Sequence, residues 1–268
     1  MIKKTKIALI QSKISNNYKN NLNQSIFHIR KAASKKAKII CLPELFLSNY
    51  FCQSENHSNF RLAEKIPGKT TKIFCDLAKE LKIVLVISMF EKKTSGFYHN
   101  TSVIINELGK IISKYRKMHI PDDPGFYEKF YFTPGEQNFK PIETSVGKLG
   151  VMICWDQWYP EAARIMTLKG ADILIYPTAI GWNPQDSKNE KNRQLEAWKA
   201  IQKSHAIANG VHLITVNRIG HEVDTSNQTS GIDFWGNSFI CGPQGEELFN
   251  ASKEKTSIVI EIDKSNTE

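Results

Sequence analysis

Residues 147–160, GKLGVMICWDQWYP, decide the fold that the sequence predicts. Leu149 to Ile153 is a continuous apolar run, which is typical of a strand that a sheet buries on both faces. The run stops at Cys154, and Pro160 then opens a helical pattern, because proline fits the first turn of a helix, where its missing N–H is not needed. A thiol therefore follows the carboxyl end of a buried strand, which is the edge where open α/β sheets bind ligands.

The same alternation of apolar strands and amphipathic helices continues through the whole chain. We expect helices at 21–37, 71–81, 160–168 and 192–209. We expect strands at 6–11, 38–42, 83–90, 99–105, 110–116, 149–153, 171–176, 211–216, 238–241 and 257–262, with a Glu-Leu-Gly turn at 107–109 that joins two of them as a hairpin. No linker-like stretch or repeat divides the pattern, so the sequence predicts one α/β domain over residues 1–268.

The cysteines and the first residues indicate the compartment. The five cysteines are widely spaced and contain no C-x-x-C pair, which fits free thiols in a reducing environment and excludes the common zinc frameworks. The opening stretch, MIKKTKIALIQSK, holds too short an apolar run for a signal peptide, and no stretch is long and apolar enough to span a membrane. We therefore expect a cytoplasmic protein with no membrane partner and no metal.

The net charge of +9 raises the question of a nucleic-acid partner. The basic residues are scattered, often beside acids as in Glu190-Lys191, and no zinc-finger or RNA-recognition signature accompanies them. The motifs G-x-G-x-x-G, H-E-x-x-H and G-x-S-x-G are also missing, so nucleotide, zinc-protease and serine-hydrolase functions lack their sequence support. We expect a solvated basic surface and no nucleic-acid partner.

Two more polar residues stand where apolar strands end. Glu44 follows the apolar stretch 39–43, and Lys117 follows the strand predicted at 110–116. Taken alone, these two residues and Cys154 have ordinary structural explanations, since most charged residues are exposed and cysteine is often a small buried hydrophobe. The stretch 117–135 then breaks every periodicity and is rich in proline, glycine and acids, which indicates a long ordered loop with a functional role.

Together these residues make the chain resemble the carbon–nitrogen hydrolase (nitrilase) family, whose Glu-Lys-Cys triad lies in comparable settings. The matching segments are ICLPE ending at Glu44, YRK ending at Lys117 and GVMICWD around Cys154. The resemblance spans nearly the whole chain, in order. It implies a four-layer α-β-β-α sandwich, no metal or organic cofactor, and assembly into a homo-oligomer of two or more subunits.

Within that family the chain most resembles the members that hydrolyse N-carbamoylputrescine to putrescine, ammonia and carbon dioxide, a step in making putrescine and polyamines from agmatine. The segments that carry this resemblance are HIPDDPGFYEKFYFTPG at 119–135, CWDQWYPEAARIM at 154–166, YPTAIGW at 176–182 and NRQLEAWKAIQKSHAIANGVHLITVNRIG at 192–220. The expected partner is therefore a small carbamoylated amine.

The chemistry of the residue types supports the same hypothesis. A thiol attacks an amide or ureido carbonyl once a base takes its proton, and Glu44 is the expected base. Lys117 and the backbone N–H of Trp155 would stabilise the oxyanion, and one such donor is typically worth about 10²- to 10³-fold in rate. By resemblance, Glu128 would hold Lys117 or the substrate's amide nitrogen. We expect His119 to be a hydrogen-bonding loop residue rather than a base.

A carbamoylated amine needs acidic or carbonyl groups at its ammonium end and aromatic walls along its methylenes. The loop residues that could supply them are Asp122, Asp123, Tyr127, Trp155, Trp182 and Asp186, with Asp122 or Asp123 expected at the ammonium. Related hydrolases of carbamoyl amino acids carry an arginine shortly after the cysteine that grips the substrate carboxylate. Here the first arginine after Cys154 is Arg164, inside the predicted helix.

Two alternatives remain open at this point. The first is a hydrolase of N-carbamoyl-β-alanine or of an ω-amide, which predicts a carboxylate-binding arginine at the site. The second is a basic binding protein on a hydrolase-like scaffold, which predicts a salt-dependent affinity for nucleic acid that survives Cys154→Ala.

Overall fold

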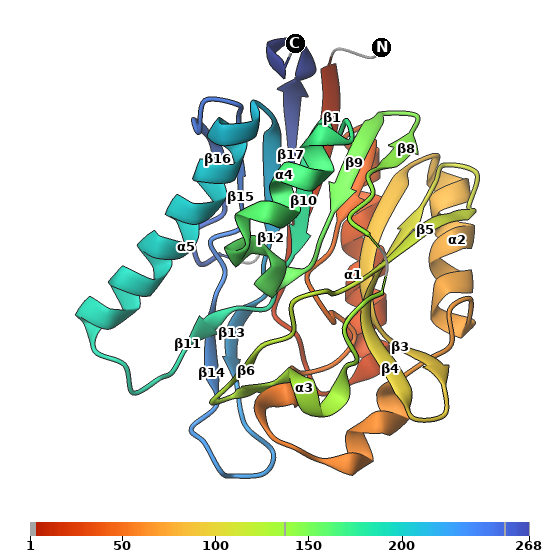
Figure 1. Ribbon diagram of the computed structural model, residues 1–268. Helices are drawn as coiled ribbons and strands as arrows, with labels where there is room; N and C mark the ends of the chain where they lie inside the picture. Colours follow the sequence, from red (N-terminus) through yellow and green to blue (C-terminus); the bar gives the residue numbers. More distant parts are fainter. Residues whose placement is uncertain (1–3, 137, 255, 268) are drawn as a thin grey trace.

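The structure is a computed structural model that describes residues 4–136, 138–254 and 256–267. Two six-stranded sheets lie face to face at its centre (Figure 1). The first sheet consists, in spatial order, of β17 (Thr256–Asp263), β1 (Lys4–Gln11), β2 (Ile39–Cys41), β3 (Val84–Thr94), β4 (Phe97–Ile105) and β5 (Ile111–Arg116). The second consists of β16 (Glu247–Asn250), β15 (Phe239–Cys241), β12 (His212–Val216), β10 (Ile173–Pro177), β9 (Gly147–Val151) and β8 (Ile142–Thr144).

The strand directions explain why the site can form. In the first sheet β1, β2 and β3 run parallel, and because β3 and β5 are both antiparallel to β4, β5 runs parallel to β3 as well. In the second sheet β9, β10 and β12 run parallel. The carboxyl ends of β2 and β5 therefore lie at one edge of the first sheet, and those of β9 and β10 lie at one edge of the second.

Helices cover the outer faces of both sheets (Figure 1). The helices α1 (Tyr18–Ser34) and α2 (Lys69–Leu81) pack on the first sheet, where Ile29 and Phe74 are completely buried in one apolar cluster. The helices α4 (Pro160–Leu168) and α5 (Lys188–Asn209) pack on the second sheet through Ala162, Trp198 and their neighbours. Each helix turns one apolar stripe to its sheet, as an amphipathic helix must in order to remove that stripe from water.

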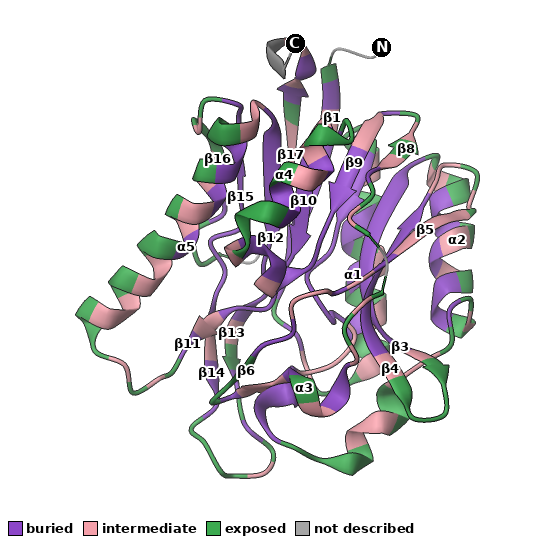
Figure 2. Cartoon of the chain, in the orientation of Figure 1, coloured by how far each residue is buried: buried purple, intermediate pink, exposed green. Residues whose placement is uncertain are grey.

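A third apolar cluster fills the space between the sheets. It consists of side chains from both inner faces, mainly isoleucine, valine and leucine, such as Leu9 and Val86 of the first sheet and Val151 and Ile175 of the second. Figure 2 shows these central strands almost entirely in the colour of buried residues. β-Branched side chains suit strands buried on both faces. The four layers confirm the α-β-β-α sandwich that the sequence predicts.

Every expected helix and strand is present, with small differences at the ends. α1 ends at Ser34 rather than residue 37, because Lys36 turns to the left-handed backbone region with φ 68°. α5 begins one turn earlier than expected, because the hydroxyl of Ser187 accepts the N–H of Glu190 as an N-cap. The strand before Cys154 ends at Val151 instead of Ile153.

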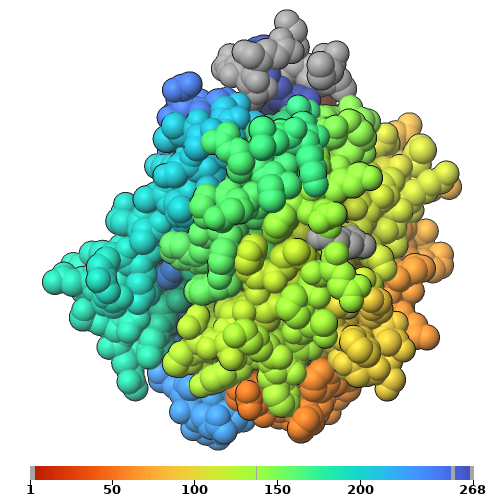
Figure 3. Space-filling view, in the orientation of Figure 1, coloured from red at the N-terminus to blue at the C-terminus, as the bar shows by residue number. Residues whose placement is uncertain are grey.

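The loops at the carboxyl edges carry several short elements. They are the turns η1 (Phe51–Gln53), η2 (His57–Leu62) and η3 (Cys154–Trp158), the strands β6 (Asp122–Asp123), β7 (Phe126–Tyr127), β11 (Gly181–Trp182), β13 (Ile219–Glu222) and β14 (Ile232–Trp235), and the helix α3 (Glu128–Tyr131). The turn η4 (Lys264–Thr267) follows β17 at the opposite edge. In the space-filling view the loop around α3, in yellow-green, adjoins the light-blue segment between β13 and β14 (Figure 3). Of the described helices, none has the length and apolar character needed to cross a membrane.

Candidate active site

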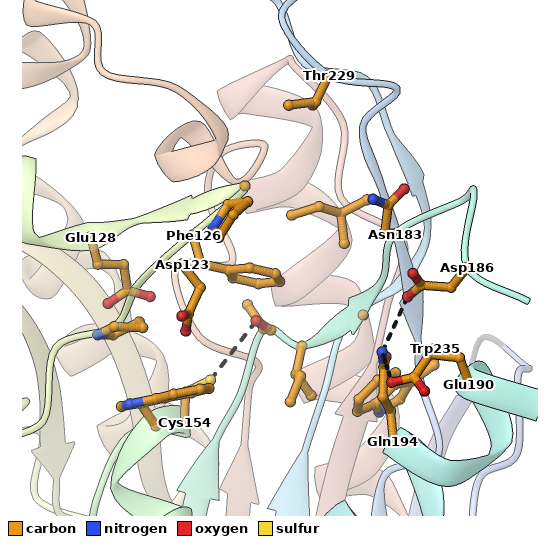
Figure 4. Close-up of a pocket in the computed structure, with 18 of the residues that line it drawn as sticks. Asp123, Phe126, Glu128, Cys154, Asn183, Asp186, Glu190, Gln194, Thr229 and Trp235 are labelled. Atoms are coloured by element: carbon orange, nitrogen blue, oxygen red, sulfur yellow. Dashed lines mark hydrogen bonds between the residues drawn. The ribbon is translucent and has the colours of Figure 1, made fainter.

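A cavity of about 600 Å³ lies where β9 and β10 end. Its walls come from the loop after β5, the turn η3, the loop after β10, the first turns of α5 and the hairpin of β13 and β14. The side chains used below that line it are Asp123, Phe126, Glu128, Cys154, Trp155, Trp158, Asp186, Glu190, Arg193, Gln194, Ile232 and Trp235. In Figure 4, Cys154 and Glu128 lie on one side of the cavity, and Asp186, Glu190 and Gln194 lie on the other.

Lys117 is the centre of a buried charged cluster. Its Nζ donates to Oε1 of Glu44 at 2.9 Å and to Oε2 of Glu128 at 2.7 Å. The side chains of Lys117 and Glu44 are completely buried, and that of Glu128 is 1% exposed. Charges so far from water are tolerated only when they are paired and hydrogen-bonded. The structure therefore brings Glu44 to Lys117 and Glu128, which lie more than 70 residues later in the sequence.

The two carboxyl oxygens of Glu44 are in different environments. Oε1 accepts hydrogen bonds from Lys117 and from the side-chain amide of Asn100, at 2.9 Å and 2.6 Å. Oε2 is buried and has no hydrogen-bond partner among the described residues. Asn100 also accepts the backbone N–H of Lys117 at 2.9 Å, so this residue of β4 holds both the acid and the lysine. Oε2 is left as the oxygen that can take a proton.

Cys154 is the first residue of η3 and has a positive φ of 40°, which is uncommon for a residue with a side chain. Its Sγ lies 3.8 Å from the carbonyl oxygen of Ala179. Burial raises the pKa of the Cys154 thiol well above its ordinary value, the charge of Glu44 raises that pKa further, and Lys117 lowers it. At neutral pH the sulfur is thus a thiol, and it becomes a good nucleophile only when a base removes its proton during attack.

Lys117 and Glu128 influence the charge of one another. Burial disfavours the charged lysine, but the carboxylates of Glu128 and Glu44 hold the pKa of Lys117 well above its ordinary value, so Lys117 is a permanent cation. Burial raises the pKa of Glu128 to about 7, against the lowering effect of Lys117. The hydroxyl of Tyr50 donates to Oε1 of Glu128 at 2.6 Å, so both oxygens of Glu128 accept hydrogen bonds, which suits its ionised form.

A second buried carboxylate, Asp156, connects the lysine loop to the cysteine loop. Asp156 accepts hydrogen bonds from the hydroxyl of Tyr115 at 2.8 Å, from the backbone N–H of Ile153 at 2.9 Å and from the backbone N–H of His119 at 3.0 Å. The ring of His119 pairs with the same carboxylate at 2.7 Å through Nδ1. His119 is therefore occupied by Asp156, as expected for a hydrogen-bonding loop residue.

Trp155 is the second residue of η3 and lines the cavity. The first N–H groups of a helical turn have no partner within that turn, and the backbone N–H of Trp155 is one of them. Among the described residues, no group of three or more His, Cys, Asp and Glu side chains is arranged to hold a metal ion. The chemistry available here is that of a thiol, a base and a buried cation.

The structure separates the six loop residues expected at the substrate, of which Trp155 and Asp186 line the cavity. Asp123 lines the cavity, whereas Asp122, Tyr127 and Trp182 do not belong to its lining. Asp122 is exposed and lies 3.8 Å from the ammonium of Lys129. Trp182 is buried in the apolar cluster of the second sheet, and its indole N–H donates to the carbonyl of Lys191 at 2.8 Å, because β11 folds back against β14. The predicted wall of the cavity is instead formed by Phe126, Trp155, Trp158 and Trp235.

The other side of the cavity holds Asp186, which the sequence predicts as a possible substrate-binding residue, together with Glu190, Arg193 and Gln194, which it does not single out. Gln194 donates to Asp186 at 3.2 Å and to Glu190 at 2.9 Å (Figure 4). Arg193 also lines the cavity, and its guanidinium pairs with Glu190 at 2.8 Å. The spacing of four residues between Asp186, Glu190 and Gln194 is a signal that could have placed them on one side of the helix start.

Comparisons with known proteins agree with this geometry. The family model described as carbon-nitrogen hydrolase matches residues 6–268. An N-carbamoylputrescine amidase from Oryza sativa subsp. japonica is 44% identical over 97% of this chain and 86% of its own length. A citrullinase from Francisella tularensis is 39% identical over 95% of this chain and 87% of its own length.

The fold has a solved counterpart. The crystal structure of a carbon-nitrogen hydrolase from Helicobacter pylori G27 superposes with a TM-score of 0.96 at 49% identity, covering 98% of this chain and 91% of that one. The match extends over both sheets and both helical layers. From the family model, the relatives and this structural match, the chain belongs to the carbon-nitrogen hydrolase family.

Proposed function

We propose that this protein is an N-carbamoylputrescine amidase, which hydrolyses N-carbamoylputrescine to putrescine, ammonia and carbon dioxide. The observation that carries the proposal is the arrangement of the cavity, with a thiol and its buried charged partners on one side and half-buried carboxylates on the other (Figure 4). A molecule with a ureido group at one end and an ammonium at the other matches that arrangement. Four plant relatives of the same name, 41–44% identical to this chain, support the same substrate.

In the first half-reaction the thiol of Cys154 attacks the ureido carbon, and its proton passes to Oε2 of Glu44. Lys117 and the backbone N–H of Trp155 stabilise the negative oxygen of the tetrahedral intermediate. The bond from carbon to the terminal nitrogen then breaks, and Glu44 returns the proton so that ammonia leaves. A carbamoyl thioester remains on Cys154. The free Oε2 of Glu44 and the neutral resting thiol support these roles.

In the second half-reaction a water molecule attacks the thioester carbon and gives its proton to Glu44. The carbon–sulfur bond breaks, the sulfur of Cys154 takes the proton back, and the released N-carboxy amine decomposes to putrescine and carbon dioxide. Glu128 acts through Lys117, because its carboxylate keeps the lysine charged and fixes its position at 2.7 Å. The enzyme performs both halves with the same base and the same oxyanion donors.

Recognition of the substrate falls to the acids along the cavity. Asp123 lies on the side of Cys154 and Glu128, where it can accept an N–H of the ureido group (Figure 4). Asp186 and Glu190 lie on the far side and bind the ammonium, while Phe126 and Trp155 cover the methylenes. Arg193 and Glu190 form an ion pair at 2.8 Å, so their charges largely cancel and Asp186 leaves this end of the cavity negative, which favours an ammonium over a carboxylate.

The test compares three ureido compounds at equal concentration by ammonia release. Citrulline has the carbon chain of N-carbamoylputrescine plus a carboxylate beside its ammonium, and N-carbamoyl-β-alanine has a carboxylate in place of the ammonium. We expect N-carbamoylputrescine to have the highest kcat/KM. Faster turnover of citrulline would show that the protein is a citrullinase rather than an N-carbamoylputrescine amidase. Faster turnover of N-carbamoyl-β-alanine would show that its preferred substrate carries a carboxylate.

We further propose that the enzyme is a cytoplasmic homo-oligomer. Leu168 of α4, Ile207 of α5 and Leu248 of β16 are large apolar side chains that are 77%, 54% and 40% exposed on the outer layer of the second sheet. Burial of such side chains against a second copy would remove them from water. Light scattering on the purified protein tests the assembly. The five cysteines are all free thiols, which suits a reducing compartment.

A further inference from the structure

Arg218 is a completely buried arginine that follows β12 and contacts the segment carrying the catalytic acid. Its Nη2 donates to the backbone carbonyls of Glu44 and Leu45, at 2.7 Å and 3.0 Å, and its Nη1 donates to that of Ser48 at 3.2 Å. The guanidinium also lies 5.2 Å from the ring centre of Phe234. A planar guanidinium suits the role of holding a loop backbone, because its N–H donors point to several carbonyl oxygens in fixed directions.

Glu222, 2% exposed, completes the arrangement from β13. Its carboxylate accepts Nη1 of Arg218 at 2.8 Å and 3.1 Å. The same carboxylate accepts the backbone N–H of Tyr50 at 2.6 Å. The ion pair therefore holds the segment 44–50 at both ends.

The two ends of that segment lead to the two buried carboxylates of the site. One end is Glu44 itself, and the other is Tyr50, whose hydroxyl donates to Glu128 at 2.6 Å. Between them Leu45 has a φ of 48°, in the left-handed region that residues with side chains rarely adopt. Such a conformation persists only when surrounding contacts hold it, and the bond from Arg218 to the Leu45 carbonyl is one of them.

We propose that Arg218 and Glu222 are positioning residues, which fix the segment 44–50 so that Glu44 faces the thiol of Cys154 and Tyr50 faces Glu128. The contacts of the pair that carry this role are with the backbone of the segment 44–50, so the pair acts through that segment and not on the substrate. The proposal rests on the proposed role of Glu44 as base, but it does not depend on which carbamoylated amine is the substrate.

The experiment measures base function without substrate, as the rate at which iodoacetamide alkylates Cys154 across a pH series. Mass spectrometry of the Cys154 peptide separates this signal from that of the half-buried Cys75. The titratable and charged groups near Glu44 are Lys117, Glu128, Cys154, Tyr50, Cys52 and Arg218. Of these six residues, the variants Arg218→Lys and Glu222→Gln replace only Arg218. The reference variant is Glu44→Gln, which removes the base.

Arg218→Lys keeps the positive charge but replaces the planar guanidinium, which donates to three backbone carbonyls of the segment, with a single ammonium group. We expect its alkylation profile to move away from the wild-type profile and toward that of Glu44→Gln, because Glu44 then no longer holds its place beside the thiol. With substrate, we expect kcat to fall by up to about 100-fold while KM changes little, as for a small misplacement of a catalytic group. Glu222→Gln keeps an acceptor for Tyr50 and should move both readouts in the same direction by less, so it serves if Arg218→Lys does not fold.

The matched control is Glu91→Gln. Glu91 is also a buried carboxylate, 2% exposed, but among the described residues its side chain bonds to Thr101, Lys114 and Arg116. We expect this variant to melt at a lower temperature and to keep the wild-type alkylation profile, which separates loss of stability from loss of positioning.

Suppose that Arg218→Lys and Glu222→Gln keep the wild-type alkylation profile and the wild-type kcat, although they melt at lower temperatures. This result would overturn the positioning role and leave the proposed role of Glu44 as base intact. A wild-type alkylation profile in Glu44→Gln would overturn the proposed base and the positioning role together. The two failures are therefore distinguishable.

Discussion

The two ends of the cavity are built in opposite ways. At the thiol end, Glu44 comes from one part of the chain and Lys117 and Glu128 from another. All three are at most 1% exposed, and Lys117 donates hydrogen bonds to both acids. At the far end, Asp186, Glu190 and their neighbours come from one short stretch at the start of α5 and are partly exposed. The chemistry thus depends on buried charges that many elements hold, and selectivity depends on surface acids that one segment supplies.

This difference predicts how strongly each end responds to substitution. A buried charge that loses its partner remains desolvated, so removing one partner is costly for both stability and activity. A half-exposed charge recovers much of its hydration from water, so its loss changes mainly substrate affinity. The predictions below run from the buried end to the exposed end.

The largest effect is expected for Lys117→Ala. It removes the oxyanion cation and leaves Glu44 and Glu128 as buried carboxylates without their shared partner, so turnover should vanish and the free energy of unfolding should fall by about 3–5 kcal/mol at neutral pH. Lys117 lowers the pKa of Glu128, which burial raises to about 7, so without the lysine the folded-state pKa of Glu128 rises further. The variant is therefore less destabilised at about pH 5, where Glu128 is protonated, than at about pH 8. Thermal melts of the variant and the wild-type protein at the two pH values measure whether the loss of stability is smaller at the lower pH. An equal loss at both would contradict the buried-charge account.

Glu44→Gln keeps the shape of the side chain and removes the base. We expect kcat to fall by about 10²- to 10⁴-fold, since proton transfer by a positioned group typically contributes that much. Steady-state ammonia release measures the change. A loss of less than tenfold would show that another group takes the thiol proton.

Tyr50→Phe is expected to change the pH dependence more than the maximal rate. The hydroxyl of Tyr50 stabilises the ionised form of Glu128, whose pKa burial raises to about 7. Both oxygens of Glu128 accept hydrogen bonds, from Tyr50 and Lys117, and the ionised carboxylate is the form that accepts both. We therefore expect kcat/KM of the wild-type enzyme to fall as the pH drops through about 7 and Glu128 is protonated. Removal of the hydroxyl raises the pKa of Glu128 further, so this acid limb should move to higher pH. A limb that stays in place or moves to lower pH would contradict this role of Glu128.

The smallest effects are expected at the far end. Asp186→Asn combined with Glu190→Gln should raise KM for N-carbamoylputrescine about tenfold, as expected from two half-exposed charge contacts of about 0.5–1 kcal/mol each, with kcat nearly unchanged. The change also frees Arg193 from Glu190, so the preference over citrulline should decrease. Asp122→Asn is the matched control, because Asp122 lies outside the cavity, and it should change kcat/KM by less than about twofold. Equal effects of the control and the double variant would refute the proposed ammonium site.

The thiol end was largely predictable from the sequence, for a physical reason. Glu44, Lys117 and Cys154 each follow an apolar strand, and parallel strands bring their carboxyl ends to one edge. The residues that hold this cluster were not predictable. Asn100, Tyr50 and Asp156 look like ordinary strand and turn residues. Only the three-dimensional pairing of the strands and loops shows that Asn100 holds Glu44, that Tyr50 holds Glu128, and that Asp156 connects the lysine loop to the cysteine loop.

The rest of the cavity was predictable in part, since Asp123, Trp155 and Asp186 were expected there and line it. An acidic, aromatic-walled pocket was expected, but Asp122 and Trp182 were assigned to it because loop residues carry no periodicity that tells which side of the loop faces inward. Asp122 points to solvent and Trp182 packs into the core, while Glu190 was hidden within a charged stretch that looks like an ordinary solvated helix start. That residues 1–268 form one domain stays a prediction.

The account's central claim is that the thiol of Cys154 becomes covalently attached to the substrate's carbamoyl carbon. Rapid quenching during turnover of N-carbamoylputrescine, followed by mass spectrometry of the Cys154 peptide, tests it directly. The account predicts an added mass equal to the substrate minus ammonia, on Cys154 and absent from Cys154→Ala, which should not turn over. Turnover by Cys154→Ala, or an adduct on another residue in place of Cys154, would contradict it.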